Sequence, residues 1–245
     1  MTEADPERGE SLLSHLIELR ARLLRAVLAV LAAFIILLPF AQRLYAEFAT
    51  PLLQKLPAGG QIIAIDVASP FFAPIKLVFV LALMAAMPYV LYEAWAFVAP
   101  GLYRHEKRLA RPLLLSAVLL FYAGCAFAWF LVLPMVFAFL TAITPEGVAM
   151  MTDITRYLDF VLVVFLAFGF CFELPVAVVI CCALGWVSVE QLREARPYVV
   201  VGVFVIAAII TPPDVISQVM LAIPMCILFE LGLVVARMLE RRRAT

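Results

Sequence analysis

Long apolar runs, separated by short polar or proline-rich stretches, make up most of the chain. A helix that crosses a bilayer needs about 20 mostly apolar residues. The runs lack the alternating apolar and polar positions of a membrane β-barrel, and they exceed its strand length of about 10 residues. The pattern predicts an all-α polytopic membrane protein, a single integral-membrane domain over residues 1–245 with six transmembrane helices. The predicted spans are Leu23–Phe40, Ile75–Val98, Leu113–Ile143, Tyr157–Leu184, Tyr198–Ile210 and Ile216–Ala236.

The predicted spans differ in length. Leu113–Ile143 has 31 residues, about 46 Å of helix at 1.5 Å per residue, so it must tilt, kink at Pro134 or project beyond the bilayer. Tyr198–Ile210 has 13 residues, and the two prolines that follow prevent the helix from continuing. The last two helices are therefore expected to be short and to form a hairpin whose tip, Thr211–Gln218, stops before the far surface.

Two segments outside the spans also carry helical patterns. Four leucines from Leu12 to Leu23 recur at helical spacing. They predict an amphipathic helix over Ser11–Leu24 that lies along the cytoplasmic interface. The segment Arg43–Pro74 starts with apolar residues at helical spacing and continues with prolines and glycines. It is expected to form a short interfacial helix and a stiff connector that cap the opposite face.

Composition excludes soluble enzymes and disordered tails. The chain is 66% hydrophobic and 15% charged, with a mean hydropathy of +1.09, whereas soluble domains are roughly 25% charged. Lys plus Arg and Asp plus Glu both number 18, so the formal net charge is zero. The charge balance therefore gives no indication of a nucleic-acid partner.

The placement of the basic residues predicts the orientation in the membrane. On the predicted topology, 14 of the 18 Lys and Arg residues lie on the side of both termini. Basic residues concentrate in cytoplasmic loops. Both termini are therefore expected in the cytoplasm, with the protein integral to the inner membrane. The four on the other side are Arg43, Lys55, Lys76 and Arg156.

The cysteines and histidines predict no metal site, cofactor or catalytic centre. All five cysteines lie in apolar runs without a C-x-x-C pair, which is typical of packing residues. His15 and His105 have carboxylates nearby but no serine or cysteine arranged as a nucleophile beside them. The protein is therefore not expected to be an enzyme.

Ionisable residues inside predicted spans are candidates for function, because each costs at least about 2.5 kcal/mol at the centre of a helix. Glu173 lies mid-span, with Gly169 and Ala177 one turn away on its face and Pro175 two residues later. It is either a polar docking or proton-linked group, or a protonated side chain bonded to another helix of the chain. Glu93 and Glu230 lie closer to the cytoplasmic edge, where they are expected to reach the surface.

Two further carboxylates lie among cytoplasmic cations. Glu106 belongs to the run Arg104–Arg108, and Glu18 precedes Arg22 by four residues. A solvated charge run would explain the first. A helical pair worth about 0.3 to 0.5 kcal/mol would explain the second.

Four motifs in register resemble the TatC family, the multi-span core of the twin-arginine protein translocase. The resemblance runs from about Leu12 to Ala236. Its motifs are Ser14–Leu23, Phe97–Arg108, Phe172–Pro175 and Thr211–Gln218.

The resemblance implies a receptor that binds the signal peptides of folded proteins bearing two consecutive arginines. It also implies assembly with TatA-type and TatB-type single-span subunits, self-association in a larger complex within the lipid, and export driven by the protonmotive force. Glu18, Glu106 and Phe97 correspond to the signal-peptide site. Glu173 and Gln218 correspond to a site that meets a partner helix, expected in a groove between the fourth span and the hairpin. Pro51 and Asp214 correspond to further family positions in loops.

Two other classes stay open at this point. A proton-coupled secondary transporter of a small solute would use Glu173 as its proton carrier, but the chain has no inverted repeat and few polar residues near the midplane of several spans. A passive scaffold would leave Glu173 and the cytoplasmic carboxylates unexplained.

The 14 to 4 distribution predicts how cysteine reporters will label. In a cysteine-free background, Ala4→Cys and Thr245→Cys should react with an impermeant thiol reagent only from the cytoplasm, because basic loops stay inside. Gly60→Cys and Glu146→Cys should react only from the opposite side. Cytoplasmic labelling of Gly60→Cys would reverse the assigned orientation.

Overall fold

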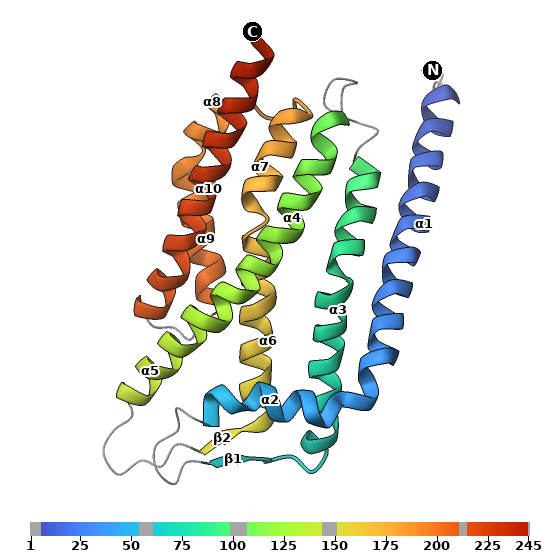
Figure 1. The fold of residues 1–245 in the computed structure, drawn as a ribbon. Helices are drawn as coiled ribbons and strands as arrows, with labels where there is room; N and C mark the ends of the chain where they lie inside the picture. The colour runs from blue at the N-terminus through green and yellow to red at the C-terminus, as the bar shows by residue number, and fades with distance from the viewer. Residues whose placement is uncertain (1–5, 54–60, 99–106, 144–150, 211–214, 245) are drawn as a thin grey trace, which may run out of the picture.

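The protein is a bundle of long helices with one small sheet at one end (Figure 1). The computed structural model describes residues 6–53, 61–98, 107–143, 151–210 and 215–244. The helices and strands are α1 (Pro6–Leu37), α2 (Ala41–Leu53), β1 (Gln61–Ile63), α3 (Ser69–Val98), α4 (Lys107–Phe127), α5 (Leu133–Ile143), β2 (Met151–Asp153), α6 (Ile154–Cys171), α7 (Leu174–Ala183), α8 (Val189–Glu194), α9 (Arg196–Ile210) and α10 (Val215–Ala244).

The architecture confirms an all-α polytopic membrane protein. Five helical stretches in the described residues are long and apolar enough to cross a membrane, and α9 is a shorter apolar helix. The first turn of α1 and the last turn of α10 lie at one end of the bundle, here called the terminal end (Figure 1). The sheet and α2 lie at the other, here called the far end.

The prediction of a separate interfacial helix over Ser11–Leu24 is wrong. The residues belong to α1, which runs without interruption from Pro6 to Leu37. No proline lies between Pro6 and Pro39, so nothing forces the helix to turn where the apolar span begins. A continuous helix cannot both cross the bilayer and lie along its surface. The amphipathic leucines therefore extend the first span toward the terminal end.

The far end contains the helix expected after Arg43 and a sheet that the sequence pattern did not indicate. A 3-10 turn, Leu38–Phe40, bends the chain at Pro39, and α2 then crosses the ends of the upright helices (Figure 1). Strands β1 and β2 pair in parallel, with Gln61 opposite Met151 and Ile63 opposite Asp153. The Asp153 side chain also accepts a hydrogen bond from the Arg156 backbone N–H at 3.2 Å, which caps α6.

The long third span is one continuous helix that is tilted relative to its neighbours, which is one of the three alternatives that its length left open (Figure 1). A π-helical segment, Ala128–Val132, joins α4 to α5 directly before Pro134. Proline has no N–H to donate and its ring collides with the preceding turn, so a widened turn accommodates it without ending the helix.

A proline in α3 is compensated by a neighbouring helix. Pro88 lies inside α3 and cannot donate to the Met84 carbonyl one turn earlier. The Tyr122 hydroxyl of α4 donates to that carbonyl at 2.9 Å. The hydrogen bond that the helix loses is thus replaced from outside, and it ties α4 to α3.

The fourth span is broken in the middle. Helix α6 ends at Cys171 and α7 begins at Leu174, so Glu173 occupies the junction. Pro175 has no N–H for the Cys171 carbonyl, and the Glu173 N–H instead bonds the Phe170 carbonyl at 3.0 Å. Proline therefore places an ionisable side chain at a helix break within the membrane.

The last two helices differ in length, which corrects the expectation that both are short. Helix α9 has 15 residues, whereas α10 has 30. Helix α10 is longer because good helix formers such as Arg237, Met238 and Glu240 carry it past its apolar part at the terminal end. The described ends of α9 and α10 nearest the far end stop before the level of α2 (Figure 1). Residues 211–214, most of the predicted loop at the tip of the hairpin, lie outside the described residues.

The core joins α4, α6 and α10 around fully buried aromatic residues. Phe121 and Phe168 are at most 1% exposed, and they pack in one cluster with Leu221 and Met225 of α10. Helices α4 and α6 approach closely at Gly124, where a Cβ atom would lie 2.4 Å from the Phe168 carbonyl oxygen. Small residues permit such contacts between membrane helices.

Replacement of Gly124 should destabilise the bundle. Gly124→Ala places a methyl group against backbone that cannot rotate away, so α4 and α6 must separate, at a cost of about 1 to 3 kcal/mol. Unfolding in detergent measures the loss. Gly202→Ala on α9 is the matched control, since nothing lies within 4 Å of its added Cβ. Equal stability of Gly124→Ala and the wild type would contradict the close helix contact.

Candidate functional grooves

A groove opens between α1 and α3 near the terminal end. It has a volume of about 260 Å³, and most of its lining is apolar. One arginine and one glutamate, Arg22 and Glu93, lie in it. The lining residues are Leu19, Arg22, Leu23, Ala26, Val90, Glu93, Ala94 and Phe97.

The charged residues of this groove form one connected network. Arg22 donates from Nη2 and Nε to Glu18 Oε1, at 2.6 and 2.9 Å. Its Nη1 also lies 3.3 Å from Glu93 Oε2, and Arg25 Nη2 lies 3.3 Å from the same oxygen. Glu93 was expected to reach the surface, but it is buried between the helices. Burial is tolerated because two guanidinium groups neutralise the carboxylate.

An aromatic contact forms the rim of the groove. The rings of His15 and Phe97 stack with centroids 4.3 Å apart and planes 22° from parallel. Phe97 also lines the groove, and His15 lies one turn before Glu18 on α1. Of the residues selected from the sequence, Phe97 therefore lines the groove, and Glu18 lies beside it through its hydrogen bonds with Arg22.

A second groove exposes Glu173 between α3 and α7. Its volume is about 280 Å³, and Glu173 is the one acidic or basic side chain among the described residues that line it. Glu173 Oε1 is buried and has no hydrogen-bond partner among the described residues, so the structure does not support an internally bonded side chain. The lining residues are Leu91, Ala94, Trp95, Phe170, Glu173, Val176, Ala177 and Ile180.

In the described residues, the side of α7 that faces α10 shows packed side chains where a groove between the fourth span and the hairpin was expected. On that side, Val178 and Val179 of α7 pack against Phe229 and Leu233 of α10. Gly169 does not leave a gap for a partner either, because the Phe121 ring fills the space at 2.7 Å from the position of its missing Cβ. The opening that Glu173 faces is bounded by α3 instead.

The comparisons with known proteins agree with these motifs and this geometry. The family described as "Sec-independent protein translocase protein (TatC)" matches residues 14–224. The chain belongs to the TatC family. It is a non-enzymatic component of the twin-arginine protein translocase, which transports proteins.

Curated members of the TatC family resemble the chain over almost its whole length. A TatC protein of Azotobacter chroococcum is 56% identical over 228 residues, 93% of this chain and 89% of the relative. That of Escherichia coli K12 is 53% identical over 231 residues, covering 94% and 90%. A crystal structure titled "Twin Arginine Translocase Receptor- TatC" superposes with a TM-score of 0.81 at 36% identity, covering 91% of this chain and 98% of that one.

Several residues assigned from the TatC resemblance lie apart from the grooves or outside the described residues. Gln218 is on α10, and its Nε2 donates to the Phe204 carbonyl of α9 at 3.0 Å. No described contact joins it to Glu173. Glu106 and Asp214 lie outside the described residues, and Pro51 belongs to α2 but its side chain is not described.

Two groove residues have roles that the sequence did not indicate. Glu93 connects Arg22 to Arg25, and Ala94 lines both grooves. The i, i+4 spacing of Glu18 and Arg22 is visible in the sequence, but Glu93 is 71 residues from Arg22. Glu230, by contrast, reaches the surface as expected and pairs with Arg196 at 2.5 Å.

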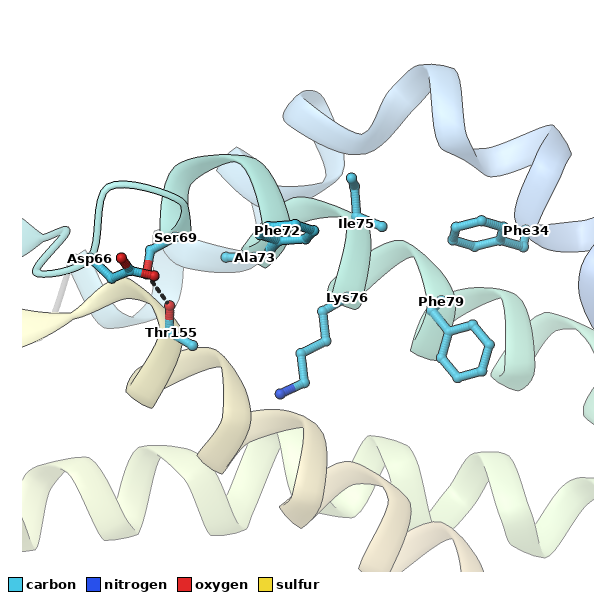
Figure 2. Close-up of a pocket in the computed structure, with 9 residues that line it drawn as sticks. All are labelled: Phe34, Asp66, Ser69, Phe72, Ala73, Ile75, Lys76, Phe79 and Thr155. Carbon is cyan, nitrogen blue, oxygen red and sulfur yellow. Dashed lines mark hydrogen bonds between the residues drawn. The ribbon is translucent and has the colours of Figure 1, made fainter.

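A third cavity at the far end involves none of the assigned residues. Figure 2 shows its lining from α1, α3 and α6, with a volume of about 460 Å³. Thr155 donates to the Ser69 hydroxyl at 2.8 Å there. Lys76, the main cation in the cavity wall, pairs with Asp159.

Proposed function

We propose that this TatC-family chain is the receptor of its translocase and binds twin-arginine signal peptides in the groove between α1 and α3. The observation that carries the proposal is that Phe97 lines this apolar groove and that Glu18 binds Arg22, another residue of its lining.

The groove suits both parts of a signal peptide. Such a peptide has a basic start followed by an apolar stretch of 7 to 15 residues. Glu18 already accepts two N–H groups from one guanidinium, in the geometry that favours arginine over lysine. Beside it, Leu19, Leu23 and Val90 offer an apolar wall for the stretch that follows.

Glu106 is proposed as the second carboxylate for the arginine pair. The next residue, Lys107, begins α4 at the same end of the bundle as the groove (Figure 1). If both termini are cytoplasmic, as the distribution of basic residues predicts, the groove faces the compartment that supplies folded cargo. Two carboxylates would then serve two arginines.

The groove at Glu173 is proposed to receive the helix of a TatA-type or TatB-type subunit. An unpartnered carboxyl oxygen within the membrane favours a polar group on the approaching helix. Gln218 is proposed as a second contact, near the hairpin. Pro51 and Asp214 are proposed to act in the loops, and the protonmotive force to drive export.

A shared wall supports communication between the two proposed sites. Ala94 of α3 lines the groove at Glu18 and the groove at Glu173. An occupant of one groove therefore lies one helix away from an occupant of the other. No such pairing is expected of a small-solute transporter, and family membership decides against that class.

Loss of either proposed carboxylate should weaken peptide binding. Glu18→Ala and Glu106→Ala should each raise the Kd for a twin-arginine peptide about tenfold or more, because a charged pair is worth roughly 1.5 to 3 kcal/mol. Fluorescence anisotropy with the full chain in nanodiscs measures the Kd.

The control for Glu18 is Glu47→Ala, which removes another helical Arg–Glu pair, with Arg43, at the far end. A Lys-Lys peptide is the control ligand and should be insensitive to all three variants. Wild-type affinity of both Glu18→Ala and Glu106→Ala for the Arg-Arg peptide would refute the carboxylate assignment.

Changes at Glu173 should separate partner docking from peptide binding. Glu173→Ala should reduce crosslinking to a single-span subunit and cargo export several-fold while peptide binding stays normal, because it removes the polar contact in the membrane. Glu173→Gln keeps hydrogen bonding and should be mild. A photocrosslinker at Ala177, exposed in the groove, reports docking.

Leu28 on α1 is the control position for crosslinking, since it is exposed but lies outside both grooves. Capture of the partner from Ala177 but not from Leu28 is expected. Normal export by Glu173→Ala together with no capture from Ala177 would show that Glu173 has no docking role.

A further inference from the structure

Arg22 is shared between two carboxylates of very different exposure. Its Nη2 and Nε hold Glu18 at 2.6 and 2.9 Å, while its Nη1 lies 3.3 Å from Glu93. The Glu18 side chain is 38% exposed and the Glu93 side chain 3%. A guanidinium arriving from the cytoplasm would therefore reach Glu18 and not Glu93.

The contact that Arg22 makes with Glu18 is the contact proposed for the peptide. Both N–H groups of Arg22 that reach Glu18 bond the same oxygen, Oε1. A guanidinium of the chain thus binds the oxygen that a guanidinium of the signal peptide would require. The two cannot bind that oxygen in the same way at once.

We propose that Arg22 is an internal competitor for the signal-peptide arginine and that Glu93 is the residue that accepts Arg22 when the peptide takes Glu18. This inference rests on the proposed function of the groove. Glu93 is a positioning residue, because it acts through Arg22 and does not touch the peptide.

The charges of the network make such an exchange feasible. Glu93 Oε2 lies 3.3 Å from Arg22 Nη1, a long hydrogen bond, and forms an ion pair with Arg25 at the same distance. A small side-chain movement brings Arg22 closer to Glu93 as it leaves Glu18, so its charge stays paired at each stage. Without Glu93, displacement would leave Arg22 in the groove with no carboxylate.

The exchange applies only to ligands that bind Glu18. Competition lowers the apparent affinity of such a ligand by the fraction of Glu18 that is available. An arginine recovers both hydrogen bonds that Arg22 gives up, whereas a lysine ammonium lacks the planar two-bond geometry. A Lys-Lys peptide, which is not expected to depend on Glu18, is therefore not subject to the competition.

A double-mutant cycle in the full chain tests the exchange. The Kd values of Arg-Arg and Lys-Lys peptides are measured in nanodiscs for wild type, Arg22→Gln, Glu93→Gln and the double variant. Arg22→Gln should bind the Arg-Arg peptide about threefold to tenfold more tightly, whereas the affinity for the Lys-Lys peptide, which does not depend on Glu18, should change little. Glu93→Gln should weaken Arg-Arg binding about threefold to tenfold, since Arg22 then depends on Glu18 alone.

The double variant decides whether Glu93 acts through Arg22. It should bind like Arg22→Gln, because Glu93 has no function in peptide binding once Arg22 is gone. Weaker binding by Arg22→Gln than by wild type would overturn the proposal. An equal loss from Glu93→Gln with and without Arg22 would also overturn it, and would leave Glu93 a structural residue.

Two further measurements keep the test decisive. If Arg22→Gln does not fold, Arg22→Lys replaces it, since a lysine holds Glu18 less well and should likewise tighten binding; wild-type or weaker binding would then refute the exchange. Glu18→Gln is measured in parallel. If it binds Arg-Arg peptide as wild type does, the proposed function fails; if only the Arg22 results fail, the groove assignment stands without the exchange.

Discussion

Hydrocarbon offers no hydrogen-bond partner to a peptide N–H or C=O group, so every segment inside the bilayer must satisfy its own backbone. Continuous helices meet this requirement, but each proline removes one backbone N–H donor, and the hydrogen bond lost must be compensated. The Tyr122 hydroxyl replaces the bond that Pro88 removes from α3. A π-helical turn accommodates Pro134, and a helix break accommodates Pro175. The break places Glu173 at a junction, and the hydrogen bond from Tyr122 joins α4 to the helix that separates the two grooves.

Helix α3 is the central element of the proposed recognition apparatus. One side faces α1 and contributes Glu93, Ala94 and Phe97 to the groove with the arginine network. The other faces α7 and contributes Leu91, Ala94 and Trp95 to the groove of Glu173. Because α3 lines both grooves, one bundle can contain the proposed peptide site near its terminal end and the proposed partner site within the membrane. Helix α6, which packs closely against α4 at Gly124, contributes Phe170 to the groove of Glu173.

The two proposed sites would recognise polar groups by different physical means. At Glu18 the carboxylate is half-exposed, and selectivity would come from the planar, two-bond geometry of a guanidinium. At Glu173 the surroundings are apolar, and a single hydrogen bond would be stronger because little water is present there. The buried Glu93 links the site at Glu18 to the interface between α1 and α3, where Arg22 and Arg25 form ion pairs with it.

The sequence alone determined the helices, their approximate ends and the residues of the family motifs, because apolar runs of membrane length and local proline effects are properties of adjacent residues. It also selected Glu18, Phe97 and Glu173. The tertiary structure decided which of these share a groove, the burial of Glu93 against Arg22, the fusion of Ser11–Leu24 with the first span and the β1–β2 pairing. Each of these depends on contacts between residues distant in sequence, or on a helix continuing where no local signal stops it. The groove beside Glu173 opens toward α3 because α10 packs against the other face of α7. Side-chain packing between whole helices determines this arrangement.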